Sequence, residues 1–71
     1  MSESEYLVIY EADEDGWSAY SPDLPGCVAA ADTKDELEGL MAEAIPFHLE
    51  GLRHAGLQVP QPSSRAGYVP A

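Results

Sequence analysis

Apolar residues in the first half of the chain fall in three short segments that suit β-strands. Residues 5–12 (EYLVIYEA) are rich in β-branched and aromatic side chains, and residues 17–21 (WSAYS) alternate large and small ones. Residues 13–16 (DEDG) form a turn sequence, because glycine permits positive φ and aspartate tolerates turn geometry. Two prolines in residues 22–26 (PDLPG) interrupt any strand, and a third apolar segment, residues 27–31 (CVAAA), follows. The pattern predicts a three-stranded antiparallel meander.

The spacing of apolar positions becomes helical in the second half of the chain. Apolar residues recur every three or four positions through residues 33–55, which predicts one amphipathic helix. Thr33 and Glu36 have the spacing of a capping box, in which the threonine hydroxyl accepts a hydrogen bond from the glutamate N–H. Pro46 lies inside this helix and removes one backbone hydrogen bond. Since the apolar stripe keeps its phase across Pro46, we expect one helix with a kink near residues 42–46.

The length of the chain allows one domain, residues 1–71. After the helix, residues 57–66 have the composition of a loop, and residues 67–70 (GYVP) predict a short final strand. The predicted order is β-β-β-α-β, an α+β fold with the helix on one face of the sheet. A right-handed crossover can return the last strand parallel to the first, which gives the sheet order 3-2-1-4.

The first predicted strand is apolar on both of its faces, although the chain has only one helix to cover a face. Tyr6, Val8 and Tyr10 point to one side and alternate with apolar residues that point to the other. We expect Tyr6, Val8 and Tyr10 to form the interface of a homo-oligomer, most simply a dimer. The alternative is that the loop of residues 57–66 folds over them. Self-association suits a small chain whose single cysteine allows no intrachain disulfide.

The charge balance of the chain is strongly acidic, with 3 Lys and Arg against 13 Asp and Glu and a formal net charge of −10. Nucleic acids are bound by basic surfaces, so we expect this chain alone to bind neither DNA nor RNA. An acidic surface attracts a basic partner protein; the alternative is that the charge serves only solubility. The acidic start and the short apolar runs predict no secretion signal, no membrane association and a cytoplasmic protein.

The carboxylates of the sequence do not suggest a nuclease. Two-metal nucleases need several carboxylates that converge on ions about 4 Å apart. Glu11 is the only carboxylate close to the interior of a predicted strand. The others considered lie in turns, in a loop or at the start of the helix: Asp13, Glu14, Asp15, Asp23 and Asp32. We therefore predict that the protein is not an enzyme.

Two pairs of residues could in principle support other chemistry. Cys27 would need a base such as His48 to act as a nucleophile, whereas a lone cysteine is usually a small buried hydrophobe. Glu50 and His54 have the i, i+4 spacing of two metal ligands, but a pair without a third ligand is usually a surface contact. We favour the structural interpretation for both pairs and predict no metal and no cofactor.

Three stretches of the sequence occur together in an order and spacing that resembles a known family. They are residues 13–17 (DEDGW), the link of residues 21–27 (SPDLPGC) and the helix start of residues 32–36 (DTKDE). The link is the most specific of the three. In these features the chain resembles the HicB antitoxin family, and the similarity extends from about Tyr6 to Pro62.

The resemblance implies a partial RNase H fold and a function in a toxin–antitoxin system. Members of this family inhibit HicA toxins, which are small basic mRNA interferases, and many carry a C-terminal DNA-binding domain. The sequence ends at Ala71, so we expect no such domain here. The alternative function is a stand-alone homo-oligomeric module with a ligand-binding or scaffold role. We expect a toxin to contact Trp17, Tyr20, Asp23 and Leu24, although Trp17 could equally pack within the hairpin.

Overall fold

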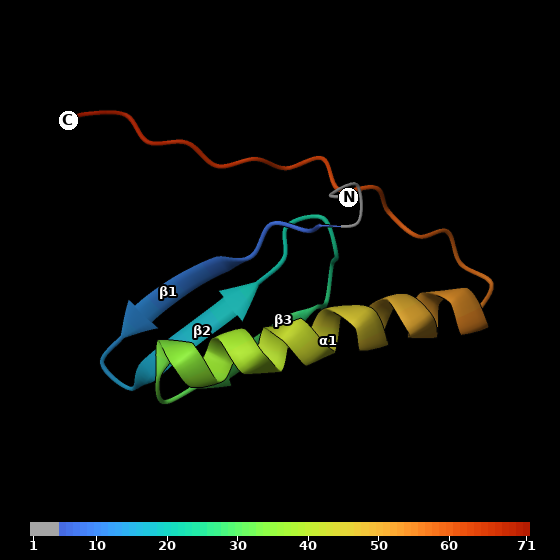
Figure 1. Cartoon of the computed structure of the whole chain (residues 1–71), viewed down its shortest axis with the longest axis horizontal. Helices are drawn as coiled ribbons and strands as arrows, with labels where there is room; N and C mark the ends of the chain where they lie inside the picture. The colour runs from blue at the N-terminus through green and yellow to red at the C-terminus, as the bar shows by residue number, and fades with distance from the viewer. Residues whose placement is uncertain (1–4) are drawn as a thin grey trace.

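The computed structural model describes residues 5–71, in which three strands are followed by one helix. The strands are β1 (Ile9–Asp13), β2 (Gly16–Tyr20) and β3 (Val28–Ala31), and the helix is α1 (Lys34–His54). The strands form one antiparallel sheet in the order β1-β2-β3, with α1 along one face (Figure 1). The predicted α+β class and antiparallel meander are thereby confirmed. Most of the acidic start noted above, residues 1–4, lies outside the described residues.

The hairpin of β1 and β2 is closed by the predicted acidic turn. β1 begins at Ile9, which pairs with Tyr20, while residues 5–8, expected to belong to this strand, have no strand pairing. Gly16 follows the turn with a φ of 142°, and a Cβ at this position would lie 2.7 Å from the Ala31 carbonyl oxygen. Glycine is required here, because any other residue would combine an unfavourable backbone conformation with a steric clash.

The helix begins at its predicted cap and continues without interruption through Pro46. The Thr33 hydroxyl accepts a hydrogen bond from the Glu36 N–H at 3.1 Å, which is one half of the predicted capping box. At the other end, the chain leaves the helix at Gly56, which has a φ of 73°. A glycine in this conformation is a common helix stop. The sequence pattern thus predicted one helix correctly, with bounds within one residue of those observed.

A small core lies between α1 and the sheet. Leu24 comes from the link between β2 and β3 and is fully buried, as is Leu37 of α1. The link closes around Leu24 through backbone hydrogen bonds from the Ser21 N–H to the Cys27 carbonyl at 3.2 Å and from the Cys27 N–H to the Leu24 carbonyl at 3.0 Å. Each buried Leu or Met contributes about 1.5–3 kcal/mol, so few side chains support the fold. The buried core residues are Ala19, Leu24, Cys27, Leu37 and Met41.

The final strand predicted over residues 67–70 is not formed. The described chain has no helix or strand after α1, and the segment runs away from the end of the helix as an extended trace (Figure 1). Tyr68 is 99% exposed and Val69 is 88% exposed. A strand needs backbone hydrogen bonds to a neighbouring edge, but this segment is fastened at Ser63 and Ser64 to the link after β2. Within residues 5–71 the sheet therefore has three strands and not the four-stranded order 3-2-1-4.

The helix covers the face of the sheet opposite to the one expected. Tyr6, Val8 and Tyr10 are half-buried and pack against the core. The Lys34 ammonium at the start of α1 lies 4.8 Å from the centre of the Tyr10 ring. The Tyr6 hydroxyl donates a hydrogen bond to the Pro60 carbonyl oxygen at 2.6 Å, so the loop after the helix covers this side chain. The expectation that these residues form an uncovered face is wrong. For Tyr6 the alternative applies, because the loop after the helix covers this side chain.

Candidate partner-binding surfaces

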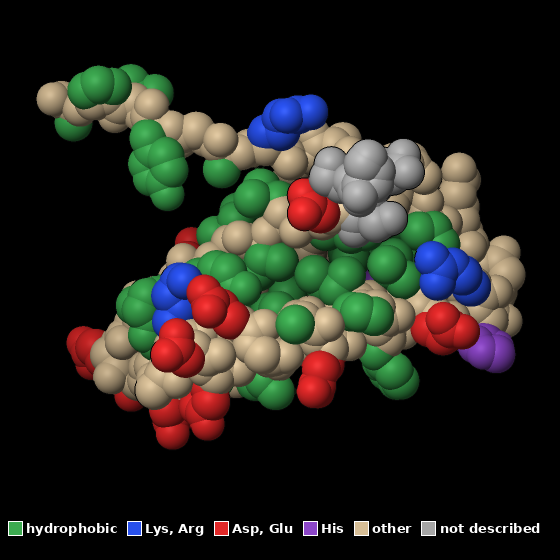
Figure 2. All heavy atoms as spheres, viewed as in Figure 1, with side chains coloured by type: hydrophobic (Ala, Val, Ile, Leu, Met, Phe, Trp, Pro, Cys, Tyr) green, Lys and Arg blue, Asp and Glu red, His purple; other side chains and the backbone are tan. Residues whose placement is uncertain are grey.

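Carboxylates gather where the β1–β2 turn meets the start of α1. The two segments lie against each other, because Gly16 approaches the backbone of Ala31, just before the helix. Figure 2 shows acidic side chains concentrated at this end of the molecule. The acidic end, as this surface is called below, consists of the exposed residues Asp13, Glu14, Asp15, Asp32, Asp35 and Glu36. Their combined charge makes this end attractive to a basic partner.

Lys34, the basic residue at this end, does little to offset these charges. Its ammonium forms an ion pair with Glu38 on the helix surface and lies over the Tyr10 ring. The hydrogen bond to Glu38 raises the pKa of the Lys34 ammonium, which therefore stays charged at neutral pH. Because the Lys34 charge is already paired with Glu38, this residue does not neutralise the carboxylates of the β1–β2 turn.

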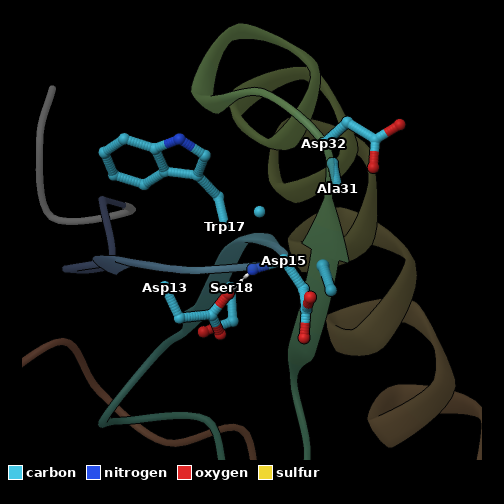
Figure 3. Close-up of a pocket in the computed structure, with 8 residues that line it drawn as sticks. Asp13, Asp15, Trp17, Ser18, Ala31 and Asp32 are labelled. Atoms are coloured by element: carbon cyan, nitrogen blue, oxygen red, sulfur yellow. Dashed lines mark hydrogen bonds between the residues drawn. The ribbon is translucent and has the colours of Figure 1, made fainter.

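The acidic end contains an open depression of about 300 Å³. Figure 3 shows the carboxylates of Asp13 and Asp15 on one side of the strands and the Trp17 ring on the other. The Asp13 carboxylate also accepts a hydrogen bond from the Asp15 N–H at 2.8 Å, which fixes the turn. A guanidinium or ammonium group suits a depression with this charge. The depression is lined by Asp13, Asp15, Gly16, Trp17, Ser18, Ala30, Ala31 and Asp32.

The face of the sheet away from α1 is apolar at one end. The antiparallel register aligns Ile9, Tyr20 and Val28 in one row across all three strands. Tyr20 is 39% exposed and Val28 is 66% exposed. This row, called the open face below, ends at the link that contains Asp23. An exposed apolar row on the face of a sheet is typical of a protein–protein interface.

Asp23 is occupied within the chain itself. One of its carboxylate oxygens accepts hydrogen bonds from the N–H groups of Ser63 and Ser64, both at 2.9 Å. The other accepts from their hydroxyl groups, at 3.1 Å for Ser63 and 2.8 Å for Ser64. The backbone hydrogen bond from Ser64, followed by that from Ser63, lowers the pKa of Asp23 from 3.8 to about 2. This contact, the Asp23 anchor, holds the segment after α1 on the link after β2.

The four side chains predicted to contact a toxin are in different environments. Tyr20 belongs to the open face and Trp17 is half-buried beside the depression. Leu24 is fully buried and has no surface to offer in this conformation, while Asp23 is engaged by two serines. Val28 was not among the predicted contact residues. It lies opposite Tyr20 in the register of β2 and β3, which the predicted antiparallel meander already implies.

The residues considered for catalysis or metal binding lie in the core or in surface ion pairs. Cys27 is buried, and burial raises the pKa of its thiol, which disfavours the reactive thiolate. Glu50 lies 3.9 Å from the His54 imidazole and 3.6 Å from the Arg53 guanidinium, as expected of exposed surface pairs. Glu11 is exposed on β1. Within residues 5–71 there is no group of three or more His, Cys, Asp or Glu side chains arranged to hold a metal ion.

A family model described as a HicB-like antitoxin of a bacterial toxin–antitoxin system matches residues 6–70. This match covers most of the chain, and the protein therefore belongs to the HicB-like antitoxin family. The resemblance noted in the sequence is thereby confirmed. In the described part of the chain, α1 is not long and apolar enough to cross a membrane.

Three curated proteins are similar to this chain, and one of them is named as a HicB antitoxin. The chain is 34% identical over 64 residues to a 14.9 kDa protein from the rep–hol intergenic region of Haemophilus phage HP1, covering 90% of this chain and 48% of the phage protein. It is 31% identical over 64 residues to antitoxin HicB 2 of Photorhabdus laumondii, covering 84% and 43% respectively. A UPF0150 protein of Archaeoglobus fulgidus is 41% identical over 46 residues, which cover 63% of this chain and 67% of that protein. The chain thus spans about half the length of the first two relatives.

Proposed function

We propose that this protein is an antitoxin that binds and inhibits a small basic mRNA interferase of the HicA type. Membership of the HicB-like antitoxin family supports the antitoxin role. The choice of a basic partner rests on the acidic end, where carboxylates from two segments lie around an open depression. Inhibition would be stoichiometric and would require neither catalysis nor nucleic-acid binding by this chain. It would take place in the cytoplasm, where mRNA is the toxin's substrate.

Charge and shape have separate roles in this proposal. A chain with a formal charge of −10 attracts a basic protein over roughly one Debye length, about 8 Å at physiological salt, which increases the rate of encounter. Specificity then comes from contacts that exclude water. We assign these to Tyr20 on the open face and to Trp17 beside the depression. Asp23 and Leu24 act indirectly, because they hold the link after β2 in shape.

The test is a growth assay in which the protein is expressed together with a candidate toxin, first of all a small basic protein encoded beside it. We expect the toxin alone to arrest growth and the pair to grow normally, and the purified proteins to form a stable complex. Tyr20→Asp should weaken the complex, whereas Phe47→Asp, which places the same charge on the outer surface of α1, should not. A candidate toxin that is neither bound nor neutralised would contradict the proposal for that partner.

The second candidate function is a homo-oligomeric module with a ligand-binding or scaffold role and no toxin partner. The open face favours it, since Ile9, Tyr20 and Val28 form an apolar row that α1 does not cover. The two functions are distinguished by the growth assay. Self-association is compatible with both, because an antitoxin can act as a dimer.

A further inference from the structure

The outer strand β3 has no charged residue to protect its edge. Within residues 5–71 it pairs only with β2, and its sequence is Val28-Ala29-Ala30-Ala31. Charged side chains and prolines are the usual means by which a sheet keeps other strands away from its edge. β1, at the opposite edge, carries the exposed residues Glu11 and Asp13, whereas β3 carries neither a charge nor a proline. The outer side of β3, called the β3 edge below, is therefore open to pairing.

The ladder between β2 and β3 shows which backbone groups face outward at the β3 edge. The Ser21 N–H donates a hydrogen bond to the Cys27 carbonyl at 3.2 Å, one pair beyond the register of Tyr20 with Val28. Backbone groups in an antiparallel ladder alternate between the two sides of the strand. The N–H and carbonyl groups of Val28 and Ala30 therefore point away from β2, and both residues are exposed.

We propose that an extended segment of the basic toxin pairs with the β3 edge and continues the antitoxin sheet. This inference rests on the proposed function and specifies the surface at which the toxin is held. The four residues of β3 span roughly 13 Å, enough to pair with three or four residues of a partner. The backbone of the partner would supply the hydrogen bonds, and its side chains would supply the specificity.

The surroundings of the β3 edge define the side chains that such a segment needs. Val28 belongs to the apolar open face and is 66% exposed, so an apolar side chain suits the position beside it. Ala30, two positions along and on the same face of the sheet, lines the acidic depression together with Asp15 and Asp32 (Figure 3). An arginine or lysine suits the position beside Ala30. The partner segment would thus carry an apolar and a basic residue two positions apart.

Charge complementarity favours a basic toxin over a second copy of this chain as the occupant. Each copy has a formal charge of −10, so two copies joined at this edge would bring like charges together. β3 of a second copy would also offer only valine and alanine to the depression. A basic toxin supplies the missing charge.

Hydrogen exchange, measured by NMR, tests the pairing directly. The partner is the toxin that the growth assay shows to be neutralised by this protein. We expect the Val28 and Ala30 amides to exchange rapidly in the free chain and at least tenfold more slowly in the complex. The Ala29 and Ala31 amides face β2 and should be protected in both states. This alternation would distinguish an added strand from general burial, which would slow exchange without a period of two.

A proline substitution tests whether the pairing contributes to affinity. Ala30→Pro removes an outward N–H, and an edge strand tolerates proline at such a position. We expect it to weaken toxin binding about tenfold, while Ala30→Ser, which keeps the N–H, should bind like the wild type. Thermal unfolding of both variants checks that the fold is kept.

The outcomes separate this inference from the proposed function. A stable complex in which the Val28 and Ala30 amides still exchange rapidly would overturn the inference and leave the antitoxin role intact. A toxin that is not bound at all would overturn both. Protection of the two amides in the concentrated free chain would assign the β3 edge to a second copy and would also overturn the inference.

Discussion

Asp23 and Ser64 are joined by two hydrogen bonds, of 2.9 Å from the Ser64 N–H and 2.8 Å from its hydroxyl, although 41 positions separate them in the sequence. Ser63 donates two more to the same carboxylate. The contact determines the course of the chain after α1, because it ties that segment to the link after β2 and not to the edge of β1. Residues 65–71 therefore start from a fixed point at Ser64.

Replacing Asp23 by Asn should release the segment after α1. The amide lacks the charge that strengthens all four hydrogen bonds and offers only one oxygen to accept them. Trypsin should then cleave after Arg65 several times faster than in the wild-type chain, as followed by mass spectrometry. Cleavage after Arg53, within α1, serves as an internal reference. Glu43→Gln is the control, because it removes the same charge from the helix surface and should leave cleavage at Arg65 unchanged. If Asp23→Asn also leaves cleavage at Arg65 unchanged, the contact of Asp23 with the two serines does not hold this segment.

The anchor should resist acid. The hydrogen bonds from Ser64 and Ser63 lower the pKa of Asp23 from 3.8 to about 2. A carboxyl group with a lowered pKa in the folded state contributes stability that is fully present above its ordinary pKa and is lost as the pH falls through the lowered value. Protection of residues 63–66 from hydrogen exchange should therefore persist at pH 4 and decrease between pH 4 and 2. Loss of protection already between pH 6 and 5 would exclude Asp23 as its cause.

Gly16→Ala should destabilise the fold. The backbone at Gly16 has a φ of 142°, and the added methyl group would lie 2.7 Å from the Ala31 carbonyl oxygen. Strain of this kind costs about 1–3 kcal/mol, or roughly 4–8 °C in melting temperature for each kcal/mol in a domain of this size. Gly39→Ala is the matched control, because a Cβ there meets nothing within 4 Å and alanine favours helices. Thermal unfolding should show opposite shifts for the two variants.

Thr33→Ala should shorten or loosen the start of α1. The substitution removes the hydroxyl that accepts the Glu36 N–H at 3.1 Å, a loss of about 1 kcal/mol. The melting temperature should fall by several degrees, while Thr33→Ser, which keeps the hydroxyl, should stay close to the wild-type value. Equal melting temperatures for the alanine and serine variants would mean that the cap does not contribute to stability.

Charge reversal at the acidic end should slow toxin capture. Glu14→Lys with Asp15→Lys replaces two negative charges of the turn by positive ones, and the association rate with a basic toxin should fall roughly tenfold or more at low salt. Glu43→Lys with Glu50→Lys makes the same change in net charge away from the acidic end and should have a smaller effect. Stopped-flow measurements at several salt concentrations compare the two. Identical rates would show that net charge, and not the acidic end, steers the encounter.

The sequence by itself determined the local elements of this protein. The turn of residues 13–16, the helix that begins after Thr33 and its continuation through Pro46 all follow from interactions between residues a few positions apart. Family membership could also be read from the link of residues 21–27, because its two prolines and glycine restrict the backbone whatever surrounds them. The acidity of the protein surface follows from composition, since 13 carboxylates cannot be hidden in so small a core.

Only the tertiary structure decided which face of the sheet α1 covers and where the chain goes after it. Both faces of β1 are apolar, so alternation alone could not show that Tyr10 lies under Lys34 and that Ile9 lies on the open face. The segment after α1 reads as a strand by composition, yet a strand forms only beside an edge that it can reach. The contact of Asp23 with Ser63 and Ser64 sets the path of that segment, and a contact across 40 or more positions leaves no local pattern in the sequence.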